Sequence, residues 1–106
     1  MSSKSTFSNS ASNSYATALY ELAKENSVLE KIENDIKSLK KIISENSNFE
    51  EAISSPTITK DDKKNIMFTI ADKSNFDLLL KKFLGFVALK NRLFFLNKII
   101  DSFLNL

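Results

Sequence analysis

The 106-residue sequence contains no cysteine and no histidine, and it has only one glycine and one proline. Without Cys and His, the chain lacks the commonest zinc ligands, a thiol nucleophile and the usual general base near neutral pH. The lone Gly85 and Pro56 exclude a glycine-rich phosphate loop and disfavour a turn-rich β sandwich or barrel. These absences favour a helical protein that binds a partner, and no metal or other cofactor is expected.

The charges are nearly balanced, with 15 Lys and Arg against 13 Asp and Glu. This balance is too even to imply nucleic acid, because a nucleic-acid binder usually concentrates basic residues on one face or groove, so no nucleic-acid partner is expected. The longest apolar run, residues 83–89, has seven residues, whereas a membrane span needs about 18. Direct membrane insertion is therefore not expected. Residues 1–10 carry one Lys and no apolar segment, which predicts a disordered Ser/Asn tail rather than a secretory signal.

Apolar residues recur at helical spacing in six segments of residues 11–106, and no segment alternates with a period of two. The sequence therefore predicts an all-α fold, a compact bundle of six short helices within one domain. The expected helices span residues 11–25, 27–45, 49–54, 60–71, 75–90 and 92–105.

Capping signals set these expected boundaries. Ser27 and Glu30 have the spacing of a capping box, and Pro56 is expected to end the third helix. Side chains expected to cap the later helices, or to stop one of them, are those of Ser47, Asn48, Thr59, Ser74, Asp77 and Asn91. On the second helix, Asp35 is expected on the solvated face, together with the lysines.

The last third of the chain is unusually apolar, because 19 of the 31 residues from Phe76 to Leu106 are apolar. One buried face per helix does not require so many. One interpretation is that one of the last two helices is surrounded on all sides by the bundle. The other is that part of the surplus lines an exposed groove for a partner helix.

Carboxylate pairs are the remaining candidates for chemistry: Glu50 with Glu51, and Asp61 with Asp62. Adjacent residues on a helix point away from each other, so neither pair converges on one site. Their positions in the expected first turns suit the helix dipole instead. The sequence therefore predicts no catalytic residue and no metal site.

Three segments resemble parts of one known protein family. Residues 14–23, SYATALYELA, resemble the opening helix of that family, although Ser14 stands where the family usually has Arg or Pro. Residues 54–60, SSPTITK, resemble its short helix followed by a proline and a polar cap. Residues 83–93 resemble its fifth helix and the turn to the sixth, and they contain the only Arg of the chain. Together the three segments resemble the delta subunit of bacterial F-type ATP synthase, the family of the mitochondrial oligomycin-sensitivity-conferring protein.

The resemblance implies a non-catalytic stator component that takes part in rotary ATP synthesis and proton transport. It implies that this domain binds the amino-terminal helix of an alpha subunit on top of the catalytic head, as one copy per complex and as a monomer in isolation. It also implies a peripheral location on the cytoplasmic face of a bacterial inner membrane. The family's chains are longer, so the sequence is expected to be a fragment that lacks the second domain, through which the subunit meets the peripheral stalk.

The same resemblance implies a partner-binding groove between the first and fifth helices. The residues expected to line it are Tyr15, Ala18, Leu19, Leu22, Phe83, Phe86, Val87 and Lys90. Periodicity alone favours the core for Leu19 and Leu22. The alternative function is a stand-alone helical adaptor that binds another amphipathic helix, because a fold does not determine its function.

Overall fold

A computed structural model describes the backbone of residues 3–106 and the side chains of residues 9–106. Its elements are α1 (Ser3–Glu25), α2 (Leu29–Glu45), α3 (Ser47–Ser54), α4 (Lys60–Lys73), α5 (Leu78–Leu89), the 3-10 turn η1 (Leu93–Phe95) and α6 (Leu96–Leu104). The described residues contain no β-strand, so the predicted all-α fold with six helices is confirmed.

The first helix begins earlier than the expected start at residue 11, because α1 already begins at Ser3. No Pro or Gly interrupts residues 3–14. The hydroxyls of Ser12 and Ser14 donate to the backbone carbonyls of Asn9 and Ser10, at 3.2 and 3.1 Å, so these serines bond within the helix. Of the expected tail, residues 1 and 2 lie outside the described residues.

Three helices end in the same way, with a residue in the left-handed region. Ser27, Asn75 and Asn91 have φ values of 57°, 56° and 58°. After each of them, the next N–H donates to a carbonyl five residues back, as from Val28 to Ala23 at 2.9 Å. These are Schellman motifs, and they end α1, α4 and α5. The predicted stop at Asn91 is confirmed, whereas the predicted capping box at Ser27 is wrong because Ser27 ends α1 instead.

Of the other predicted caps, some are confirmed and some are wrong. The side chains of Thr59 and Asp77 accept the N–H groups of Asp62 and Leu79, as predicted for the starts of α4 and α5. Asn46, rather than Ser47 or Asn48, caps α3 by accepting the N–H of Phe49. Ser74 follows the last residue of α4 and does not cap α5.

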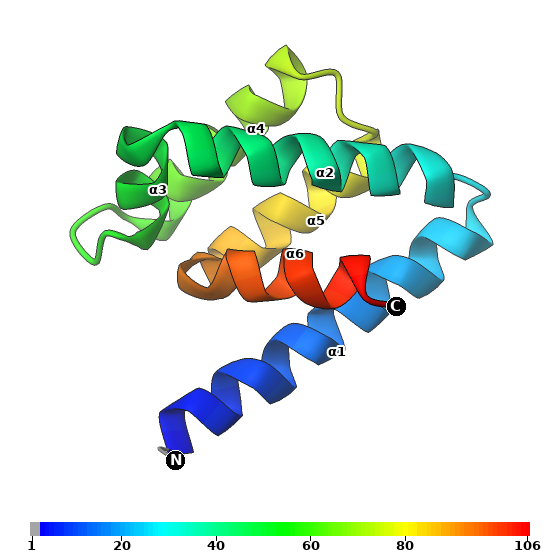
Figure 1. Cartoon of the computed structure of the whole chain (residues 1–106). Coiled ribbons are helices and arrows are strands. Elements are labelled where there is room, and N and C mark those ends of the chain that lie inside the picture. The colour runs from blue at the N-terminus through cyan, green and yellow to red at the C-terminus, as the bar shows by residue number, and fades with distance from the viewer. Residues whose placement is uncertain (1–2) are drawn as a thin grey trace.

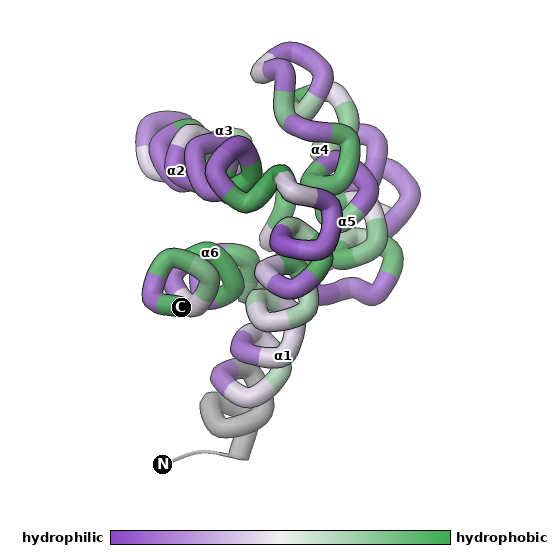
Figure 2. The backbone as a smooth tube through the Cα atoms, turned by 90° about the vertical axis from the view of Figure 1, so that its right-hand side faces the viewer, coloured by the Kyte–Doolittle hydropathy of each residue, from purple (hydrophilic) through white to green (hydrophobic). Residues whose placement is uncertain are grey.

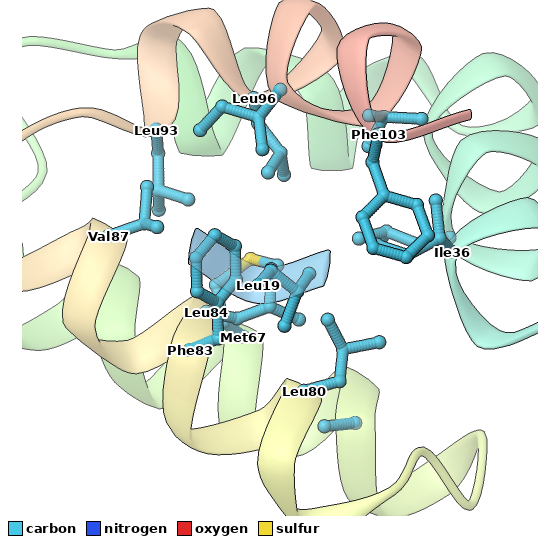
Figure 3. Packing of buried hydrophobic residues seen from close by; sticks show 14 of the residues in the cluster. Leu19, Ile36, Met67, Leu80, Phe83, Leu84, Val87, Leu93, Leu96 and Phe103 are labelled. Atoms are coloured by element: carbon cyan, nitrogen blue, oxygen red, sulfur yellow. The ribbon is translucent and has the colours of Figure 1, made fainter. Parts of the chain in front are cut away.

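The helices enclose one core. Figure 1 shows α6 between α2 and α1, and Figure 2, turned by 90°, shows the pair α4 and α5 on the other side of the core, with hydrophobic segments facing inward. In Figure 3, side chains from α1, α2, α4, α5, η1 and α6 converge, with Leu19, Met67 and Leu84 near the centre. The radius of gyration is 13.1 Å, close to the value of about 13 Å for a compact domain of this length.

One prediction about the core is wrong. Asp35 was expected on the solvated face of α2, but its side chain is only 7% exposed. It is the one buried charged side chain among residues 9–106. Its burial is compensated by Lys31 and by the N–H of Asp77, which both donate to its carboxylate.

Candidate partner-binding groove

An apolar groove of about 330 Å³ lies between α1 and α5. Its lining residues are Tyr15, Ala18 and Leu22 of α1, and Leu79, Lys82, Phe83 and Phe86 of α5. The first and last lining residues of each wall are seven positions apart, or about 10 Å along the helix at 1.5 Å per residue. That length corresponds to two helical turns.

The wall on α1 is a stripe beside the core stripe of the same helix. Tyr15, Ala18 and Leu22 follow one another at intervals of three and four residues, which places them on one face. Leu22 is 42% exposed, and Ala18 is exposed as well. The small Ala18 side chain leaves the backbone of α1 open to close approach in the middle of the groove.

The wall on α5 follows the same geometry. Leu79, Lys82, Phe83 and Phe86 stand at i, i+3, i+4 and i+7. Phe83 is buried, whereas Phe86 is 49% exposed. The aromatic rings therefore form both the floor and the accessible rim of the groove.

Tyr15 joins the two walls. Its ring packs edge-on against the rings of Phe83, Phe86 and Phe95, with centroid separations of 6.4, 6.1 and 6.1 Å. Such edge-to-face pairs are favourable beyond the area they bury. This cluster connects α1, α5 and η1 at one end of the groove.

Positive charge accompanies the apolar lining. Lys82 is the one charged residue among the described residues that line the groove. The Lys90 Nζ atom lies 5.5 Å from the centroid of the Phe86 ring, in the range of a cation–π contact. A partner with apolar side chains flanked by acidic ones would complement this wall.

Five of the eight residues expected in the groove line it: Tyr15, Ala18, Leu22, Phe83 and Phe86. Leu19 and Val87 do not, because both are fully buried in the core beneath it. Each directly follows a lining residue, and one residue is a rotation of about 100° around the helix. Lys90 is exposed and reaches the groove through its contact with Phe86, without lining it.

Leu79 and Lys82 line the groove but were not expected there. Their spacing could have predicted this position, since Leu79 lies four residues before Phe83, and Lys82 lies four residues before Phe86, which places each pair on one helix face.

The structure divides the apolar surplus into a buried part and an exposed part. Leu84 is fully buried, so α5 is covered on more than its groove side. Leu78, Phe86, Leu89 and Phe94 are 59%, 49%, 40% and 51% exposed. Three of these four residues lie on α5 and Phe94 lies in η1. Of the four, Phe86 lines the groove.

The expected carboxylate pairs lie on the surface. Glu50, Glu51, Asp61 and Asp62 are all exposed. Glu50 lies in the first turn of α3, with Glu51 just after it, and Asp61 and Asp62 lie in the first turn of α4. Among the described residues, no group of three or more acidic side chains is placed to hold a metal ion. Within the same part of the chain, no helix has the length and hydrophobicity to span a membrane.

Known proteins are similar to this chain in sequence and in fold. Residues 11–106 match the family described as ATP synthase delta (OSCP) subunit. ATP synthase subunit delta of Rhodospirillum rubrum is 39% identical over 90 residues, which cover 85% of this chain and 48% of the relative. The subunit delta of Pelagibacter ubique is 37% identical over 103 residues, covering 97% of this chain and 56% of that protein.

A solved structure agrees with these sequence matches. A chain in the cryo-EM structure of the Toxoplasma gondii mitochondrial ATP synthase hexamer superposes with a TM-score of 0.81 at 27% identity. The match covers 87% of this chain and 51% of the other. The chain spans about half the length of the relatives it matches. It belongs to the ATP synthase delta (OSCP) subunit family.

Proposed function

We propose that this chain is a non-catalytic stator component of an ATP synthase, and that its groove binds the amino-terminal helix of an alpha subunit. The observation that carries the proposal is the open apolar groove between α1 and α5 in a member of this family. In this role the domain holds the catalytic head in place and takes no part in the reaction, so it requires no catalytic residue.

The dimensions of the groove suit a helical partner. Amphipathic helices bind grooves through anchors at i, i+3 or i+4, and i+7, and that spacing spans about 10 Å. The two walls have the same length. Covering the exposed half of Phe86, about 100 Å² of ring surface, would contribute about 2 kcal/mol.

We assign contact with the peripheral stalk to the half of the relatives' length that this chain does not span. The head and the stalk would then be joined through two parts of one subunit. The complex would place this domain at the cytoplasmic face of a bacterial inner membrane, as a peripheral component present in one copy.

The direct test is an NMR titration with a synthetic peptide of the first two dozen or so residues of the Rhodospirillum rubrum alpha subunit. Chemical-shift changes should concentrate on α1 and α5 and saturate at one peptide per chain. An unrelated amphipathic helix of equal length is the control. Equal binding of both peptides would favour the helical adaptor, and no binding of the alpha peptide would count against the proposal.

Ala18→Asp tests the groove itself. A carboxylate at this position would lose its hydration under the apolar face of a bound helix, so peptide binding should weaken about tenfold or more. Ala18 is exposed in the free chain, so helicity and the melting temperature should stay unchanged. The matched control is Thr17→Asp, which adds the same charge at an exposed neighbour outside the groove. Unchanged binding by Ala18→Asp would refute the assigned groove.

A further inference from the structure

Asp35 connects α2 to the turn between α4 and α5. Its Oδ2 atom accepts the backbone N–H of Asp77 at 2.8 Å, and its Oδ1 atom accepts Lys31 Nζ at 2.7 Å. Lys31 Nζ also donates to the carbonyl oxygen of Asn75, at 2.8 Å. Two side chains of α2 therefore hold two backbone groups of a turn more than 40 residues away.

The turn they hold determines where α5 begins. Asn75 has the positive φ that ends α4, and Asp77 caps α5 by accepting the N–H of Leu79 at 2.9 Å. Leu79 is the first lining residue of the groove on α5. The carboxylate of Asp35 is thus bonded two residues before the groove wall starts.

Packing at this end of the groove is open. A hollow of about 330 Å³ separates the α1–α2 turn from the start of α5. It is lined by Asn26, Val28, Asp77, Leu78, Leu79 and Lys82. Leu79 and Lys82 line the groove as well. Side-chain packing therefore leaves space between α1 and the beginning of α5, and the directional bonds of Asp35 and Lys31 bridge the adjacent elements.

We propose that Asp35 is a positioning residue for the groove: by fixing the start of α5 against α2, it sets the separation of the two groove walls. The short turn that contains Ser27 joins α1 to α2. Because Asp35 of α2 bonds to the start of α5, α2 links the groove wall on α1 to the wall on α5. The inference rests on the proposed function, because it concerns the groove that would receive the alpha-subunit helix.

The chemistry of the Lys31–Asp35 pair suits a role in positioning α5 better than a role in stabilising the fold. Hydrophobic contacts are non-directional, whereas charge-assisted hydrogen bonds have a defined geometry. Only the Asp35 end of this ion pair is buried, since the Lys31 side chain is 49% exposed. Removing Lys31 alone would leave the buried carboxylate without its charged partner, whereas apolar residues can often replace both charges with little loss of stability. A variant that removes both charges together separates the two roles.

The test uses the double variant Lys31→Met with Asp35→Leu, and the single variant Asp35→Asn. The double variant leaves no buried charge and should remain folded with the helicity of the parent chain. Without the bonds to Asn75 and Asp77, its affinity for the alpha peptide should fall about tenfold. In Asp35→Asn the amide oxygen still accepts the N–H of Asp77, so binding should stay within about threefold of the parent.

Asp101→Asn is the matched control. Asp101 pairs with Lys40 of α2 at 2.9 Å and is 59% exposed, so this variant removes an ion pair between α2 and α6 without affecting α5. It should bind the peptide as the parent does. In the free chain, the amide shifts of Leu79, Lys82 and Phe83 should move in the double variant and stay in place in the control.

Unchanged affinity together with unchanged amide shifts in the double variant would overturn the proposal. Loss of fold in that variant would also count against it, because the pair would then be a stability element. The shifts of the free chain require no peptide. Failure of the parent chain to bind the peptide would therefore refute the proposed function, while the shifts would still test the role of Asp35.

Discussion

Gly85→Ala should destabilise the domain, although alanine is the better helix former. Gly85 lies in α5 against α4, and a Cβ atom built on it would lie 2.6 Å from Cε1 and 2.9 Å from Cζ of Phe68. Real Cβ atoms do not approach other atoms so closely. The ring or the α4 backbone must therefore move to accept a single methyl group.

The Phe68 ring is partly buried and has two lysine side chains packed against it. The ammonium groups of Lys64 and Lys81 lie 5.8 and 5.1 Å from the centroid of the Phe68 ring. Lys81 is also paired with Asp72 at 2.8 Å, and Lys64 Cγ would itself lie 3.5 Å from the new methyl group. Displacing Phe68 therefore disturbs two cation–π contacts and the packing of α4 on α5.

The magnitude follows from two opposing terms. Replacing Gly by Ala in a helix interior gains up to about 1 kcal/mol in helix propensity. Overpacking a filled contact costs about 1–3 kcal/mol. The second term is the larger, and we expect a net loss of about 1 kcal/mol in the free energy of unfolding.

Urea denaturation followed by circular dichroism measures this change. The control is the double variant Gly85→Ala with Phe68→Leu, which makes space for the methyl group. The two substitutions should be less destabilising together than the sum of the singles, with a coupling of about 1 kcal/mol. A Gly85→Ala chain as stable as the parent, or additive effects, would refute the steric argument.

Two further predictions concern α1 and the turn after α5. Leu19→Ala should cost about 3 kcal/mol of stability because Leu19 is fully buried, whereas Leu22→Ala should leave the melting temperature nearly unchanged and weaken peptide binding. Asn91→Ala should cost about 1 kcal/mol, since φ is 58° there, and Asn91→Gly should stay within about 0.5 kcal/mol of the parent chain. Urea denaturation measures the stability changes, and equal losses for Leu19→Ala and Leu22→Ala, or for the two Asn91 variants, would contradict these assignments.

The helices could be predicted from the sequence because each buries a stripe of regular spacing. The boundaries were harder, as Ser27 shows. A serine three residues before a glutamate is typical of the start of a helix. Ser27 nevertheless adopts a positive φ and ends α1. The decision depends on how α1 and α2 pack, and local spacing does not contain that information.

Asp35 shows a second limit of the sequence. Periodicity places a carboxylate among lysines on the outer face of α2, and its burial depends on an N–H that lies 42 residues away. The misplacement of Leu19 and Val87 has a simpler cause. The groove stripe and the core stripe share each helix, and adjacent residues fall on either side of the division.

This division separates the core face of each helix from the face that lines the groove. On α5, Val87 is fully buried and Phe86, one residue earlier, is 49% exposed beside the groove. On α1, Leu19 and Ala18 stand in the same relation. Successive side chains of a helix point about 100° apart. On each of these two helices, one residue therefore faces the core while its neighbour in the sequence faces the groove. The free chain keeps an apolar wall open because the helices that form it are already anchored by their other faces, and a partner helix would bind a surface that needs no prior rearrangement.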